Sequence, residues 1–96
     1  MGRDEVLKKI AARRLDLSNY YVESLFIFGS VARDEATPES DIDVLVEFSR
    51  PVGLFEFVRL RRYLEELLGS QVDLATPNSL KVQFREQILR EAVRAA

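Results

Sequence analysis

The sequence predicts an α/β (α+β) fold, a small mixed sheet of three to four strands with helices packed against it. Two short apolar runs, Val22 to Phe28 and Ile42 to Phe48, are typical of strands. Apolar residues also recur at helical spacing, most clearly from Leu54 to Leu68. With 96 residues there is room for one core, so we expect a single domain over residues 1–96.

The first half of the chain is expected to fold as helix, strand, helical turn and strand. The first helix runs from Asp4 to about Leu15, because its apolar residues follow a helical period and its first turn is acidic. Gly29 stops the first strand, and residues 30–35 are expected to form a turn of helix. The "ATPES" that follows has the composition of a loop.

The second half is expected to add helix, strand and helix. Leu54 to Leu68 forms a helix that Gly69 caps. The segment Gln71 to Ala75 is short enough for a third strand. From Ser79 onward the apolar residues again follow helical spacing, which predicts a closing amphipathic helix with these residues on one face: Phe84, Ile88, Leu89, Ala92 and Val93.

The composition excludes several classes of function. The formal net charge is -2, so the chain lacks the basic surplus of a protein that holds nucleic acid, and we expect no stable nucleic-acid binding. It has no cysteine and no histidine, which excludes Ser-His and Cys-His nucleophile pairs and the usual zinc sites. The start of the chain is charged and no apolar run approaches the roughly 20 residues of a membrane span, so we expect a soluble cytoplasmic protein.

Two aspartates, Asp41 and Asp43, stand at the start of the second apolar run. Side chains two positions apart share one face of a strand, so both carboxylates should project together while Ile42 and Val44 turn into the core. Two carboxylates about 7 Å apart at a dielectric of about 20 repel by about 2 kcal/mol. A cation between them would remove that cost; the alternative is a pair of solvated aspartates at a strand entry.

Gly29 and Ser30 end the first strand and open the expected helical turn. Backbone N–H groups in such a turn can bind phosphate, although the pair can also be a purely structural turn. Ten residues separate Ser30 from Asp41, enough for the chain to bring the second strand back beside the first. The turn and the aspartate pair should therefore meet.

Asp73, between apolar neighbours in "QVDLA", is a third candidate carboxylate. If its strand lies next to the second strand, the three carboxylates form a site of oxygen donors that suits Mg²⁺ or Mn²⁺ better than zinc. The alternative is a solvent-facing strand residue.

These residues carry a resemblance. "FGS", ten residues, "DIDV" and the later "VDL" resemble the signature of the DNA polymerase beta-like nucleotidyltransferase superfamily. The stretch "FGSVARDEATPESDIDVLVEF" is especially similar to the minimal nucleotidyltransferases, the MNT domains encoded beside HEPN partner proteins. The resemblance covers nearly the whole chain, and it implies the polymerase beta-like nucleotidyltransferase fold.

The resemblance also implies roles for the site residues. Asp41 and Asp43 would ligate two Mg²⁺ ions, with Mn²⁺ as an alternative, and Asp73 would complete the metal site toward the acceptor. Gly29 and Ser30 would hold the triphosphate of ATP. Such a site needs no histidine base, because a metal ion lowers the pKa of the attacking hydroxyl.

Four arginines and one aspartate lie outside the three carboxylates and the Gly-Ser turn. Arg33 follows the turn, where it is either solvated or a bidentate phosphate ligand. Many family members have glycine where this chain has Asp34, which adds an acidic group near the phosphate region. The helix of residues 54–68 carries a cluster that forms either a solvated face or a partner-docking surface: Arg59, Arg61 and Arg62.

The family resemblance implies an enzyme, a protein adenylyltransferase. It would act as the antitoxin of a HEPN toxin, transferring AMP from ATP to a tyrosine of that partner, in a homo-oligomer or a hetero-oligomer with it. The larger relatives have an acceptor-binding domain, and we expect none here, so the acceptor comes from outside. Two alternatives stay open: a vestigial antitoxin that neutralises its partner by binding alone, and transfer to a small molecule or RNA.

Overall fold

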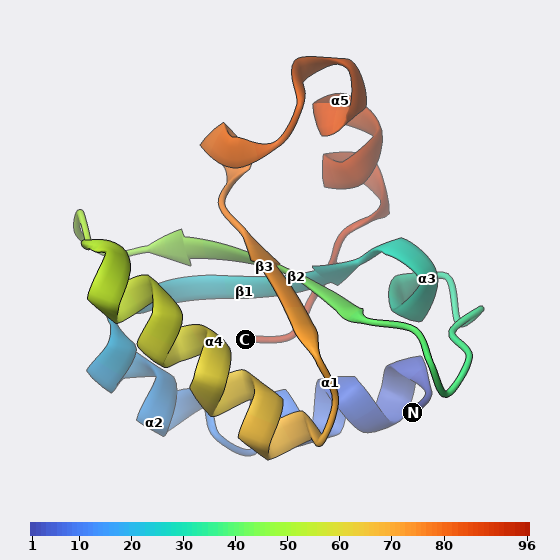
Figure 1. Ribbon diagram of the computed structural model, residues 1–96, viewed down its shortest axis with the longest axis horizontal. Coiled ribbons are helices and arrows are strands. Elements are labelled where there is room, and N and C mark those ends of the chain that lie inside the picture. Colours follow the sequence, from blue (N-terminus) through green and yellow to red (C-terminus); the bar gives the residue numbers. More distant parts are fainter.

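A four-stranded mixed sheet lies at the centre of the computed structural model, which describes residues 1–96, and confirms the predicted fold class (Figure 1). The strand order is β3-β2-β1-β4. β1 is antiparallel to both β2 and β4, whereas β2 and β3 are parallel. The strands are β1 (Val22–Phe28), β2 (Ile42–Phe48), β3 (Val72–Ala75) and β4 (Val93–Arg94).

The helices lie on both sides of this sheet. In Figure 1, α1, α2 and α4 lie on one side, α5 rises on the other, and α3 lies at one end of the β1–β2 pair. Two 3₁₀ turns, η1 (Ser18–Tyr20) and η2 (Pro77–Ser79), precede β1 and follow β3. The helices are α1 (Arg3–Ala11), α2 (Arg14–Leu17), α3 (Gly29–Ala32), α4 (Leu54–Leu68) and α5 (Val82–Glu91).

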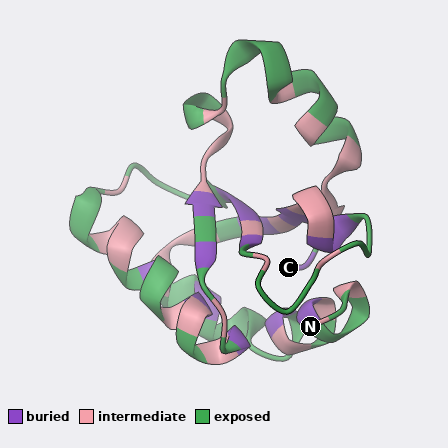
Figure 2. Cartoon of the chain, turned by 45° about the vertical axis from the view of Figure 1, so that its right-hand side comes forward, coloured by how far each residue is buried: buried purple, intermediate pink, exposed green.

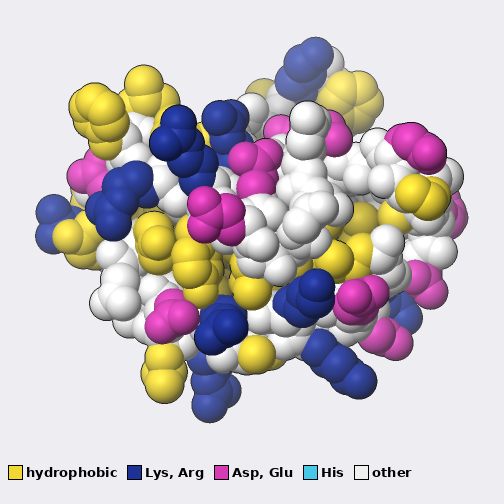
Figure 3. All heavy atoms as spheres, turned by 60° about the horizontal axis from the view of Figure 1, so that its bottom comes forward, with side chains coloured by type: hydrophobic (Ala, Val, Ile, Leu, Met, Phe, Trp, Pro, Cys, Tyr) yellow, Lys and Arg dark blue, Asp and Glu magenta, His cyan; other side chains and the backbone are white.

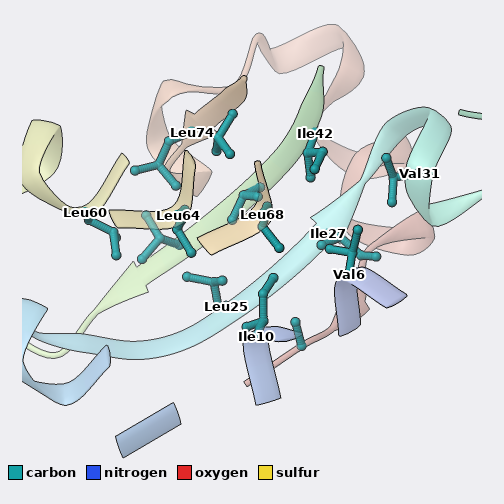
Figure 4. Close-up of a cluster of buried hydrophobic side chains, with 14 of the residues drawn as sticks. Val6, Ile10, Leu25, Ile27, Val31, Ile42, Leu60, Leu64, Leu68 and Leu74 are labelled. Carbon is teal, nitrogen blue, oxygen red and sulfur yellow. The ribbon is translucent and has the colours of Figure 1, made fainter. Parts of the chain in front are cut away.

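The main core fills the space between the sheet and the helices α1 and α4 (Figure 4). Alternate residues of β2 point into it, and Ile42, Val44 and Val46 are all buried, as the strand period predicts. From α4, three buried leucines at helical spacing meet them: Leu60, Leu64 and Leu68. Each fully buried side chain of this size contributes about 1.5–3 kcal/mol to folding, so this single layer holds the sheet in place.

The opposite face of the sheet is only partly covered. Leu45 of β2 lies on this face and is 1% exposed, yet it is not part of the main core cluster. α5 stands over this side, and none of its residues is buried. Figure 2 shows the helix largely in the colours of exposed residues. The sheet therefore has a packed face and a second face roofed by one loosely packed helix.

The first helix ends earlier than the sequence predicts. α1 stops at Ala11, and Arg13 adopts φ -113° and ψ 16°, outside the helical region, before the short α2 begins. Leu15, expected on the apolar side of a continuous helix, is 81% exposed. The break turns the chain so that Leu17 is buried in place of Leu15. Burial of Leu17 in the core therefore overrides the helical period of the sequence.

The end of the chain was also predicted wrongly. α5 stops at Glu91, and Ala92 is extended with φ -63° and ψ 135°. Val93 and Arg94 pair with Ile27 and Phe26 of β1, and Ala95 N–H donates to the carbonyl of Leu25 at 2.7 Å. Without this segment β1 would be a sheet edge with unpaired backbone groups. Backbone pairing therefore overrides the helical spacing of Ala92 and Val93.

None of the helices in the structure has the length and apolar character needed to cross a membrane.

Candidate functional site

The strand register brings the predicted carboxylates to one face of the sheet. Asp43 is the register partner of Phe28 on β1 and of Asp73 on β3. Partners on neighbouring strands project to the same side, so Asp43 and Asp73 are adjacent. Asp41 lies two residues before Asp43, just ahead of β2. This is the face opposite the main core.

The turn at Gly29 lies directly against Asp43. Gly29 has φ +68°, a conformation that L side chains rarely adopt. A methyl group at this position would overlap the Asp43 carboxylate, whose Cγ atom lies only 3.1 Å from where that methyl carbon would stand. Position 29 thus requires glycine for two reasons, and the predicted phosphate turn is in contact with the predicted metal ligand.

Asp43 is the electrostatic centre of the group. Burial, followed by the neighbouring Asp73 and Asp41 carboxylates, raises its pKa from 3.8 to about 6, while Arg33 acts in the opposite direction. A raised carboxyl pKa means that the ionised carboxylate destabilises the folded chain. A bound cation would offset that cost.

The donor set fits a hard divalent cation, because all three candidate ligands are carboxylates. In this structure, however, no group of three or more acidic side chains is arranged to hold one metal ion. The observation that supports a metal is the forced approach of Asp43 to the Gly29 turn together with its raised pKa. The oxygen atoms of these carboxylates are the type of donor that Mg²⁺ prefers.

Arg33, the predicted phosphate ligand, is engaged with carboxylates. Its Nε lies 3.4 Å from Glu35 Oε2 and its Nη1 lies 3.3 Å from Glu91 Oε2. Glu91 is the last residue of α5, so this ion pair joins α3 to α5. Its charge still acts on Asp43, since it lowers the pKa of that carboxyl.

Asp34 has a different role from the one its position suggests. Its Oδ1 accepts a hydrogen bond from the backbone N–H of Arg3 at 3.2 Å. Arg3 is the first residue of α1, and Gly2 before it has no side chain to cap the helix. Asp34 therefore supplies an N-cap from elsewhere in the chain, and it does so at φ +59°.

The arginines of α4 do not contribute to this face. The guanidinium of Arg59 lies 5.4 Å from the ring centre of Tyr20, and Arg61 and Arg62 are exposed. Figure 3 brings the side of α1, α2 and α4 forward and shows basic and acidic side chains mixed over it. That pattern is typical of a solvated surface.

Two further polar residues, which the sequence pattern did not single out, lie on the carboxylate face. Glu47, four positions after Asp43 on β2, accepts a hydrogen bond at 2.8 Å from the hydroxyl of Ser24. Ser24 is 6% exposed and is the one buried polar residue of the chain. The strand period of β2 was the available signal, since positions 43, 45 and 47 share a face.

Comparison with known proteins identifies relatives of the whole chain. The family model for the nucleotidyltransferase domain matches residues 5–95. A relative from Methanocaldococcus jannaschii, MJ0435, provisionally named a protein adenylyltransferase, is 43% identical over 93 residues, covering 97% of both chains. The protein adenylyltransferase MntA of Thermococcus cleftensis is 38% identical over 91 residues, covering 94% of this chain and 92% of MntA.

Solved structures show the same fold. One described provisionally as a minimal nucleotidyltransferase superposes with a TM-score of 0.83 at 36% identity, over 97% of this chain and 95% of that one. A toxin-antitoxin structure with AMP-PNP gives a TM-score of 0.71 at 19% identity, over 100% and 73% of the two chains. The MNT antitoxin complex with a tri-AMPylated HEPN toxin of Shewanella oneidensis gives 0.65 at 18% identity, over 94% and 71%.

Proposed function

This chain belongs to the nucleotidyltransferase domain family as one of its minimal members, and from that premise we propose that it transfers AMP from ATP to a tyrosine hydroxyl of a HEPN partner toxin. By that modification it acts as the toxin's antitoxin. The relatives that share more than a third of its residues carry the name of protein adenylyltransferase. The proposal that the acceptor is a HEPN toxin is supported by toxin-antitoxin complexes whose antitoxins share this fold.

One structural observation carries the proposal. The Gly29 turn and the Asp43 carboxylate are in contact, and Asp73 is the register partner of Asp43. A turn that can hold phosphate therefore adjoins carboxylates that can hold cations. This arrangement matches the needs of a reaction at a phosphate group.

Each residue has a proposed role. Asp41 and Asp43 would hold two Mg²⁺ ions, or Mn²⁺, with Asp73 toward the acceptor. Bound metal ions supply charge neutralisation of the triphosphate and a lowered pKa of the attacking hydroxyl. The backbone at Gly29 and Ser30 contacts the β- and γ-phosphates of ATP. Arg33 adds a positive charge beside them if it leaves Glu91, its ion-pair partner at 3.3 Å.

The proposed transfer is a substitution at the α-phosphorus of ATP by the acceptor hydroxyl. The acceptor oxygen attacks the α-phosphorus, the bond from that phosphorus to the bridging oxygen breaks, and pyrophosphate leaves. The hydroxyl proton passes to the Asp73 carboxylate and then to water. The acceptor gains one AMP unit as a phosphodiester.

Mass spectrometry tests this function directly. We expect a HEPN partner protein to gain one or more AMP units when it is incubated with the chain, Mg²⁺ and ATP. Asp43→Asn should abolish the gain, whereas Glu39→Gln, a change in the exposed loop before β2, should keep it. A partner that is inhibited but unmodified would show instead that the chain neutralises by binding.

A further inference from the structure

A small cavity lies on the carboxylate face of the sheet, next to the proposed site. Its volume is about 200 Å³, and six residues line it: Phe26, Leu45, Glu47, Pro77, Leu89 and Ala92. Leu45 is two positions beyond Asp43 on β2, about 7 Å along the strand. The cavity is therefore adjacent to the Asp43 carboxylate along β2.

The walls of the cavity are apolar and come from both layers. Phe26 and Leu45 are register partners on β1 and β2 and form the floor. Leu89 near the end of α5 and Ala92 just after it form the roof. Leu89 is still 47% exposed, so this roof is not closed by packing. A flat ring can enter between a phenylalanine floor and an aliphatic roof.

One charged residue lines this space, and its side chain is exposed to solvent. Glu47 lines the cavity, and its Oε1 accepts the hydrogen bond from Ser24 at 2.8 Å. Ser24 is fixed by burial, so the carboxylate is oriented by a rigid partner. Its second oxygen, Oε2, has no partner within the chain and remains available as a hydrogen-bond acceptor.

We propose that this cavity is the base-binding subsite of the nucleotide, with the adenine ring between Phe26 and Leu89 and its 6-amino group donating to Glu47 Oε2. The inference rests on the proposed function and adds a specificity-determining residue to it. The triphosphate lies on the Gly29 side of Asp43 and the base on the Leu45 side, so the α-phosphorus comes to the carboxylates between them.

The size of the cavity agrees with one base. Pockets for whole drug-sized ligands measure about 300–1,000 Å³, and this space of about 200 Å³ is smaller. It suits a bicyclic ring, with ribose and phosphates outside it.

The single free oxygen favours adenine over guanine. Guanine presents two adjacent donors, N1–H and the 2-amino group, which are best met by both oxygens of a carboxylate, and Ser24 already occupies one. At its 6-position guanine has a carbonyl, which a carboxylate repels. Adenine presents one amino group there.

The decisive experiment compares two nucleotides without the partner protein. Calorimetric titration with ATP and with purine riboside triphosphate, which lacks only the 6-amino group, measures that contact alone, with Mg²⁺ present throughout. A hydrogen bond to a charged group makes ATP bind roughly ten- to a hundredfold tighter in the native chain. In Glu47→Ala the two nucleotides should bind equally, while Glu23→Gln on neighbouring β1, outside the cavity, should keep the preference.

A second pair of variants tests the cavity itself. Leu89→Trp fills it and should weaken ATP binding at least tenfold. Val82→Trp adds the same side chain to α5 at a position 79% exposed and outside the cavity, and should have no effect. Both positions are partly or fully exposed, so thermal melting should be unchanged.

The outcomes separate this inference from the function it rests on. ATP binding without any preference over purine riboside triphosphate in the native chain overturns the subsite alone, whether or not AMP is transferred. Preference that survives in Glu47→Ala also overturns it. No binding of either nucleotide overturns the subsite and the proposed nucleotidyl transfer together.

Discussion

Gly29 and the Asp43 carboxylate lie so close that the side chain of any other residue at position 29 would displace the aspartate. Gly29 begins α3 directly after β1, Asp43 lies on β2, and the two residues are 14 positions apart in sequence. Because Phe28 and Asp43 are register partners, the pairing of β1 with β2 fixes this contact. The proposed phosphate turn and the proposed metal ligand therefore depend on the same strand pairing.

Replacing Gly29 by alanine should therefore destabilise the protein and abolish nucleotide binding. Alanine at φ +68° costs about 1 kcal/mol or more, and the overlap with Asp43 adds to that cost. Gly69→Ala is a matched control, because Gly69 has φ +67° and nothing lies within 4 Å of the added methyl group. Thermal melting and ATP titration of both variants measure the difference. Equal losses in the two would contradict the contact.

The raised pKa of Asp43 predicts a pH-dependent stability of the metal-free protein. Its pKa is 3.8 ordinarily and about 6 in the folded chain, so the folded state binds more protons between these values. Stability therefore falls as pH rises from about 4 to about 6. Asp43→Asn should gain about 1 kcal/mol at pH 7 to 8, a value reduced for solvent screening, and nothing near pH 3.5. Urea unfolding at both pH values measures it, with Glu39→Gln as the control.

Mg²⁺ should offset the free-energy cost of keeping the Asp43 carboxylate charged in the folded chain. In the native chain at pH 7 to 8, we expect Mg²⁺ to raise the melting temperature, because it binds the folded carboxylates and not the unfolded chain. Asp43→Asn and Asp73→Asn should respond much less. A native protein whose melting temperature ignores Mg²⁺, with and without ATP, would contradict the metal assignment.

The sequence predicted the parts of the site that depend on strand periodicity. The strand period predicts that Asp41 and Asp43 share a face, and the pairing of β2 with β3 brings Asp73 beside Asp43, while their role as metal ligands stays a prediction. The cavity beside them could not be foreseen, because the strand period places Leu45 on the Asp43 face but does not show that Leu89 of α5 lies over it. Asp34 shows the same limit: its contact with Arg3, 31 positions away, decides its role.

Asp34 should contribute to stability and not to catalysis. Asp34→Ala removes the cap of α1 and leaves alanine at φ +59°, which together cost about 1–2 kcal/mol. Asp34→Gly also removes the cap but relieves the backbone strain, so it should cost less than alanine. Urea unfolding measures both. Adenylyl transfer below the melting range should stay near the native rate; a loss of tenfold or more in both variants would place Asp34 in the phosphate site.

The strand at the end of the chain gives the last prediction. β4 and the two residues after it cover the outer edge of β1; Ala95 is only 8% exposed, and Arg94 beside it is exposed. Ala95→Gln forces an amide into the core and should cost about 2–4 kcal/mol, whereas Arg94→Gln should stay within about 0.5 kcal/mol. Both variants introduce the same residue one position apart, so the comparison isolates burial. Hydrogen exchange should also show faster exchange at the Leu25 amide, which donates to the Ala96 carbonyl, in Ala95→Gln. Equal stability of the two variants would mean that the chain end does not pair with β1 in solution.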